Sequence, residues 1–306
     1  MNTEEMKRLS EQLQGELTGE PDRDRELLLT WAERFRGDDT AQPLLREIGR
    51  LLFRLDEETT LPLTEQVMDE VLQRGEAALA QAEERLAEGE FAQAEAILAP
   101  VLEEIDSVFL PEDAVWMDFN SFLDGLLYQD LFQEEIGDRE VRRHPLHPAG
   151  LLSTCAMAQV EQGKIGQARE TLERLLRLDP VCPEYLCALA NTCLSENALE
   201  DSWEALRWAL LCASTREEAA CCYNLLALCC AAEGKRSDAA LLLQKSLRVF
   251  PLPEVEEALT QLAEQAEAGK DLSDEEINRR CQALDIPTGR SEVVEKNLDF
   301  LSSLSF

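Results

Sequence analysis

The stretch that decides the fold is Gly150–Pro180, which reads GLLSTCAMAQVEQGKIGQARETLERLLRLDP. Two later stretches repeat its pattern: EYLCALANTCLSENALEDSWEALRWALLCAS at 184–214 and CCYNLLALCCAAEGKRSDAALLLQKSLRVFP at 221–251. In all three, apolar residues recur at three- and four-residue spacing, which is the period of an amphipathic α-helix. A turn residue in the middle divides each stretch in two. We therefore predict three consecutive helix-turn-helix units.

The three units agree at the positions that a helical hairpin depends on. The turn needs a residue that tolerates left-handed backbone angles, and Gly163, Asn197 and Gly234 stand there, spaced 34 and then 37 residues apart. Five residues further on, a small residue lets the two helices approach closely, and an apolar residue follows four later; these are Ala168 and Leu172, Ser202 and Leu206, and Ala239 and Leu243. One hairpin cannot bury its apolar faces alone, so we expect neighbouring hairpins to stack.

This pattern resembles the tetratricopeptide repeat (TPR), a helical hairpin of about 34 residues. A fourth, degenerate copy lies upstream in AQAEERLAEGEFAQAEAILAPVLEEI at 80–105, with Gly89, Ala94 and Leu98 at the matching positions. The order of segments is also similar to that of uncharacterised bacterial TPR proteins. The resemblance implies a right-handed superhelix, whose concave face is made by the first helix of each repeat and binds peptides.

The fold class we predict is all-α: an α-solenoid of stacked TPR-like hairpins, with non-repeat capping helices at both ends. No stretch alternates as a strand does. Residues 112–135 read as one long apolar helix, and helices are expected at 252–268, 273–284 and 291–303. The predicted divisions are an N-terminal helical segment (1–62), a degenerate hairpin (63–107), an aromatic-rich helix with a basic, proline-containing link (108–148), three repeats (149–253) and C-terminal capping helices (254–306).

Charge excludes several partners. The chain has 62 acidic residues against 29 Lys and Arg, a formal net charge of −33. Such a surface repels phosphate backbones and anionic lipid, so we expect no nucleic-acid or membrane role. The longest apolar run, Leu225–Ala232, is too short to span a bilayer. The polar, acidic start is unlike a signal peptide, which predicts a cytoplasmic protein.

Catalytic and metal-binding patterns are missing from the sequence. The two His residues, His144 and His147, have no recognisable carboxylate or Cys partner. Nine of the ten Cys residues lie between Cys155 and Cys230, within apolar helical stretches and without a C-x-x-C pair. We expect these thiols to be reduced core residues, and we predict a non-enzyme without cofactor or metal. The alternative is a metal- or redox-responsive sensor that uses the Cys cluster.

The first candidate binding surface follows from the resemblance. Mapping the concave face onto the first helix of each repeat gives Ser153, Met157, Val160, Cys187, Asn191, Leu194, Asn224 and Leu228. None of these residues is charged and most are apolar, which favours an apolar extended or helical peptide as the partner.

The second candidate is the aromatic–basic segment. Trp116 lies within a run of aromatic residues, and Arg139, Arg142 and Arg143 follow it closely. Aromatic and Arg side chains dominate interface energetics. The alternative is that the aromatic rings are core and the arginines pair with acidic neighbours. The function we predict is a non-catalytic interaction scaffold for a protein or peptide; a self-associating structural protein is the alternative.

Overall fold

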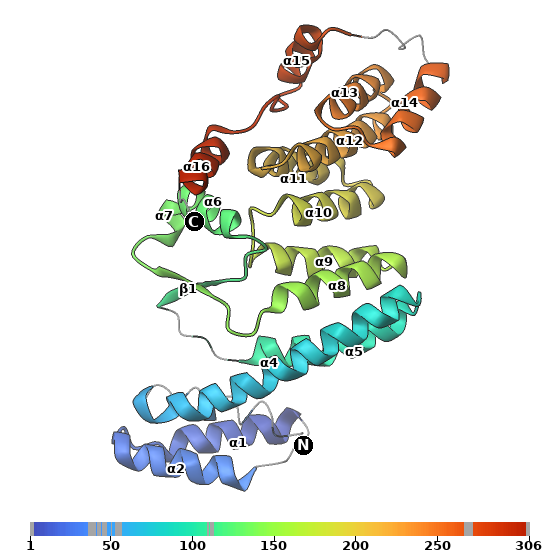
Figure 1. Cartoon of the computed structure of the whole chain (residues 1–306). Helices are drawn as coiled ribbons and strands as arrows, with labels where there is room; N and C mark the ends of the chain where they lie inside the picture. The colour runs from blue at the N-terminus through green and yellow to red at the C-terminus, as the bar shows by residue number, and fades with distance from the viewer. Residues whose placement is uncertain are drawn as a thin grey trace.

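The computed structural model describes residues 3–35, 41, 44, 48–49, 51–52, 57–108, 110, 113–265 and 272–303. These residues are mostly helical, so the all-α prediction is confirmed. At the N-terminal end, α1 (Thr3–Glu16) and α2 (Pro21–Arg34) share their own apolar cluster, which includes Leu13, Leu28 and Trp31. The helices above them follow one another along the long axis of the molecule (Figure 1).

The central helices pack as hairpins in chain order. The pairs in direct contact are α4 (Glu57–Ala87) with α5 (Phe91–Ser107), α8 (Pro148–Glu161) with α9 (Ile165–Leu176), α10 (Pro183–Ser195) with α11 (Leu199–Cys212), and α12 (Arg216–Ala232) with α13 (Arg236–Val249). Each hairpin also contacts the next, and α13 packs on α14 (Pro253–Gln265). α5 contacts α8, so the degenerate hairpin α4–α5 packs against the first regular hairpin, α8–α9.

The turns between these paired helices have the backbone that the sequence predicts. Gly89, Gly163, Asn197 and Gly234 have φ angles of 75°, 72°, 60° and 77°, all in the left-handed region. The predicted small residues Ala168, Ser202 and Ala239 are buried, and so are the apolar residues Leu172, Leu206 and Leu243. The residue types at these positions are therefore explained by close approach of the paired helices.

Ala168 provides a test of that close approach. We expect Ala168→Leu to lower the free energy of unfolding by about 1–3 kcal/mol, because extra methylene groups must force the fully buried contact apart. Ala92→Leu, on an exposed face of α5, is the matched control and is expected to change stability by less than about 0.5 kcal/mol. Urea unfolding measures both. Equal effects of the two substitutions would contradict the packing argument.

Residues 113–147 differ from the prediction of one long helix over 112–135. The structure has a short strand β1 (Ala114–Met117), helices α6 (Phe122–Leu131) and α7 (Gln133–Ile136), and a strand β2 (Glu140–Arg143) that pairs with β1 in parallel. Ser121 ends the extended stretch, because its hydroxyl accepts a hydrogen bond from the Asp124 amide (3.1 Å) and caps α6. The prediction of a single helix was therefore wrong. A strand of four residues is too short to be recognised from the alternation of apolar and polar residues in the sequence.

The C-terminal helices form close to where they were predicted but do not all cap the last hairpin. α15 (Asp274–Ala283) packs on α13, whereas α16 (Glu292–Ser303) returns down the side of the molecule to α6 (Figure 1). The connecting residues are fixed by hydrogen bonds from the Tyr223 hydroxyl to the Pro287 carbonyl (2.7 Å) and from the Ser291 hydroxyl to the Leu211 carbonyl (2.6 Å). The end of the chain thus joins the last hairpins to the inserted segment 113–147.

Candidate functional site

The predicted inner-face residues form a surface strip on the first helices α8, α10 and α12. None of them is buried: Met157, Asn191 and Leu228 are exposed, and Ser153, Val160, Cys187, Leu194 and Asn224 are partly exposed. The exposed fractions of Met157 (55%) and Leu228 (42%) are high for large apolar side chains. We call these eight residues the inner strip.

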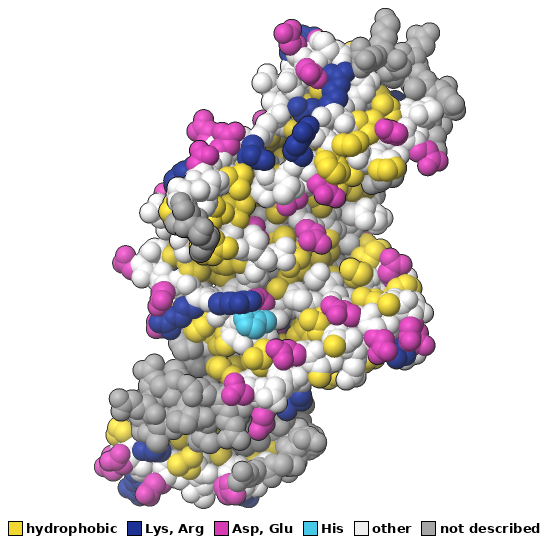
Figure 2. All heavy atoms as spheres, in the orientation of Figure 1, with side chains coloured by type: hydrophobic (Ala, Val, Ile, Leu, Met, Phe, Trp, Pro, Cys, Tyr) yellow, Lys and Arg dark blue, Asp and Glu magenta, His cyan; other side chains and the backbone are white. Residues whose placement is uncertain are grey.

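The inner strip faces outward because of the helix period. On α8, Leu152, Cys155 and Ala156 are buried against neighbouring helices, so residues 153, 157 and 160 point the other way. α10 and α12 are in direct contact, which makes their parts of the strip adjacent. Figure 2 shows apolar side chains reaching the surface along the stacked helices, with acidic side chains interspersed. The strip can bind an apolar segment without having to neutralise a buried charge.

The aromatic–basic segment is largely engaged within itself. Arg139 donates hydrogen bonds to the backbone carbonyls of Glu135 and Ile136. Arg142 forms an ion pair with Glu140 (2.8 Å) and lies 5.8 Å from the centre of the Trp116 ring. The aligned β1–β2 pair causes this contact, since Trp116 is directly opposite Arg142.

Arg143 has 73% of its side chain exposed, against 42% for Arg142, and forms a longer ion pair with Asp118 (3.8 Å). Several of the aromatic rings are structural: Phe119, Tyr128 and Phe132 contact one another in turn, and Phe132 meets Trp208 of α11 edge-on at 6.0 Å. Of the two predicted surfaces, the inner strip therefore offers more unengaged apolar side chains.

A shallow groove of about 810 Å³ lies on α10 and α11, and sequence reasoning missed it. Its apolar lining includes Trp203 and Trp208, and its acidic lining includes Glu200 and Glu204. Arg207 stands over Trp203 at 5.7 Å and forms an ion pair with Asp285 (3.2 Å). Two Trp residues five positions apart on one helix were the available signal.

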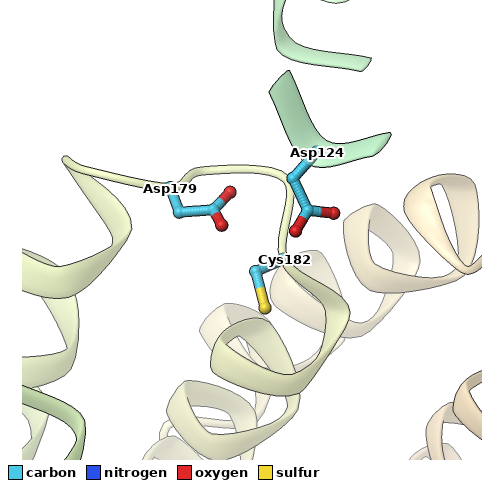
Figure 3. Close-up of side chains that lie close together, drawn as sticks. All are labelled: Asp124, Asp179 and Cys182. Carbon is cyan, nitrogen blue, oxygen red and sulfur yellow. The ribbon is translucent and has the colours of Figure 1, made fainter. Parts of the chain in front are cut away.

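A buried acidic cluster joins the inserted segment 113–147 to the hairpins. Ligand-type atoms of Asp124 (α6), Asp179 (α9–α10 loop) and Cys182 (start of α10) lie within 4.8 Å of one another (Figure 3). Asp179 accepts a hydrogen bond from the Asn120 amide (2.8 Å), which ties the two segments together. Sequence reasoning missed this cluster because the contact spans 59 residues.

Burial sets the protonation of this cluster. Desolvation raises the pKa of Asp179 to about 7 and also raises the pKa values of Asp124 and the Cys182 thiol. Carboxylate and thiolate are suitable metal ligands, but all three groups must give up protons before they can bind an ion. Burial therefore makes each of the three groups keep its proton to a higher pH than it would in water.

Asp118 makes a second link in the same region. Its carboxylate accepts a hydrogen bond from the Ala149 amide at the start of α8 (2.9 Å) and lies 3.2 Å from Nδ1 of His147. The expectation that the His pair lacks a carboxylate partner was wrong for His147. The other ring, His144, is buried and accepts a hydrogen bond from the Leu146 amide, and burial lowers its pKa.

Comparison with family models and curated proteins does not assign the chain to a family. No protein-family model matches the chain, and no curated protein matches it significantly. Among the described residues, every helix is too short or too polar to cross a lipid bilayer.

Proposed function

We propose that this chain is a non-catalytic scaffold, a TPR-like α-solenoid that binds an apolar peptide or protein segment along the inner strip. The observation that carries the proposal is the exposure of Met157 and Leu228 on helices where most of the other apolar residues are buried. Large apolar side chains held in the open on a rigid surface favour partner binding.

Two observations support the solenoid part of the proposal. Consecutive hairpins contact each other in chain order from α4 to α13, with the insert 113–147 placed to one side. Four of the turns have a residue with left-handed backbone angles at the same position, and a buried small residue follows each one. A periodic array of this kind offers a long, continuous surface to an extended or helical partner.

The thiols support a cytoplasmic location within the same proposal. All ten Cys residues are reduced thiols, and all except Cys187 and Cys221 are buried. Free thiols in this number persist in a reducing compartment. Burial rather than ligation explains most of them, in line with the prediction of core residues.

Photo-crosslinking in the native cell tests the inner strip. A photoreactive benzoylphenylalanine placed at position 157 or at position 228 is expected to capture the same partner protein. The matched control is position 167, where Gln167 is exposed on the second helix α9 and is expected to capture nothing in common with them. Non-overlapping partners from 157 and 228, or equal capture from 167, would count against the strip.

Affinity for the captured partner gives the quantitative test. We expect Met157→Lys and Leu228→Lys each to weaken binding about tenfold or more, since each places a charge in an apolar contact. Gln167→Lys adds the same charge outside the strip and is expected to leave the affinity unchanged. Titration calorimetry measures all three. Wild-type affinity in both strip variants would overturn the proposed binding mode.

A further inference from the structure

One thiol of the inner strip contacts a buried thiol from the next hairpin. Cys187 on α10 and Cys222 on α12 have their Sγ atoms 3.5 Å apart. Cys187 is partly exposed, whereas Cys222 is fully buried. A disulfide bond is about 2.0 Å long, so the two side chains need only a small closing movement to form one. The contacts between α10 and α12 hold the pair together.

The two thiols have unequal surroundings. Cys187 lies at the surface, where a small oxidant can reach it. The hydrogen bond with Cys187, together with burial, raises the pKa of Cys222 well above its usual value, so Cys222 keeps its proton. Exposure and position give them different roles: peroxide reaches Cys187 first, and Cys222, 3.5 Å away, is the second thiol, which must lose its proton as it attacks.

We propose that Cys187 and Cys222 form a reversible disulfide when the protein meets hydrogen peroxide. The Cys187 thiol gives up its proton to solvent, and the resulting thiolate attacks one peroxide oxygen; an S–O bond forms, the O–O bond breaks, and the departing hydroxide takes up a proton to give the first water. The Cys222 sulfur then attacks the Cys187 sulfur; the S–S bond forms, the S–O bond breaks, and the departing hydroxide takes the Cys222 proton as water. Overall, two thiols and one peroxide give one disulfide and two waters.

The disulfide would act on the inner strip, a consequence that rests on the proposed function. Cys187 belongs to the strip, and the bond would tie α10 to α12, the two helices that carry Asn191 and Asn224. Peroxide would then alter partner binding at this surface. Formation of the bond itself needs no partner, so it can be tested separately from the scaffold proposal.

The experiment uses the reduced, purified full-length chain. After brief exposure to a small molar excess of hydrogen peroxide, free thiols are alkylated and the digest is analysed by mass spectrometry. We expect a linked pair of peptides carrying Cys187 and Cys222, and its loss on treatment with dithiothreitol. A chain with no linked pair, or with Cys187 linked to a second chain, would overturn the proposal.

Matched variants identify the partner thiol, because Cys221 and Cys222 share one peptide. Cys221→Ser removes a partly exposed neighbour and is expected to leave the link intact. Cys187→Ser, at a partly exposed position, and Cys222→Ser are expected to abolish it. In Cys222→Ser, Cys187 is expected to remain as a sulfenic acid that dimedone labels. A link that survives in Cys222→Ser and is lost in Cys221→Ser would disprove the assignment.

Discussion

Replacing Asp179 with Asn is expected to raise the free energy of unfolding by about 3 kcal/mol at pH 8, but by only about 1 kcal/mol at pH 5.5. The Asp179 side chain is fully buried at the joint between segment 113–147 and the hairpins. Burial raises the pKa of this carboxyl group from 3.8 to about 7. At pH 8 the folded protein must therefore keep a buried negative charge, which Asn does not carry.

The direction of this pH dependence follows from the number of protons that Asp179 binds in the folded and unfolded states. Between pH 4 and pH 7 the folded state holds a proton on Asp179 that the unfolded state has released. Stability from this group is fully present below the unfolded pKa and is lost as pH rises through the folded value of about 7. Asn does not titrate. The free energy of unfolding of Asp179→Asn relative to the wild type therefore grows over this interval by about 1.4 kcal/mol per pH unit, and by less as pH 7 is approached.

Urea unfolding of the wild type and Asp179→Asn at pH 5.5 and pH 8 measures this difference. Both pH values lie above the sequence pI of about 4.3, which is the pH at which the chain carries no net charge. Asp113→Asn, at an exposed carboxylate, is the control and is expected to keep the wild-type pH dependence. If Asp179→Asn instead follows the wild-type pH profile, the carboxyl group is ionised in the fold throughout.

Local sequence pattern predicted the hairpins well, for physical reasons. A left-handed turn restricts its residue, and a close helix contact restricts side-chain volume, so Gly163 and Ala168 each carry structural information by themselves. The surface position of the inner strip follows from the helix period once the hairpins are known. Met157 and Leu228 could therefore be placed on an accessible face from the sequence.

The joint of segment 113–147 could not be predicted in this way. The β1–β2 pair brings together two four-residue strands that have a helix-containing segment between them. Contacts of Asp179 with Asn120, and of α16 with α6, depend on where whole segments lie in space. No residue type at these positions demands its partner, so a periodicity argument reads α16 as one more capping helix.

Leu206→Ala is expected to lower the free energy of unfolding by about 3 kcal/mol. Leu206 is 0% exposed and lies in the cluster shared by α10, α11, α12 and α13. Removing its side chain costs both the transfer of the lost methyl groups and the cavity they leave. Leu211→Ala is the control on the same helix; its side chain is 39% exposed, so the expected loss is below about 1 kcal/mol.

Hydrogen exchange shows where that loss is felt. In an array stabilised by contacts between neighbours, a cavity at Leu206 should speed exchange in α10 to α13. The α1–α2 amides should be unaffected, because those helices are held by a separate cluster around Leu28. Faster exchange spread evenly over the chain would instead show that the hairpins and the N-terminal helices unfold as one unit. Equal losses of unfolding free energy in Leu206→Ala and Leu211→Ala would show that Leu206 is not held in a tightly packed contact.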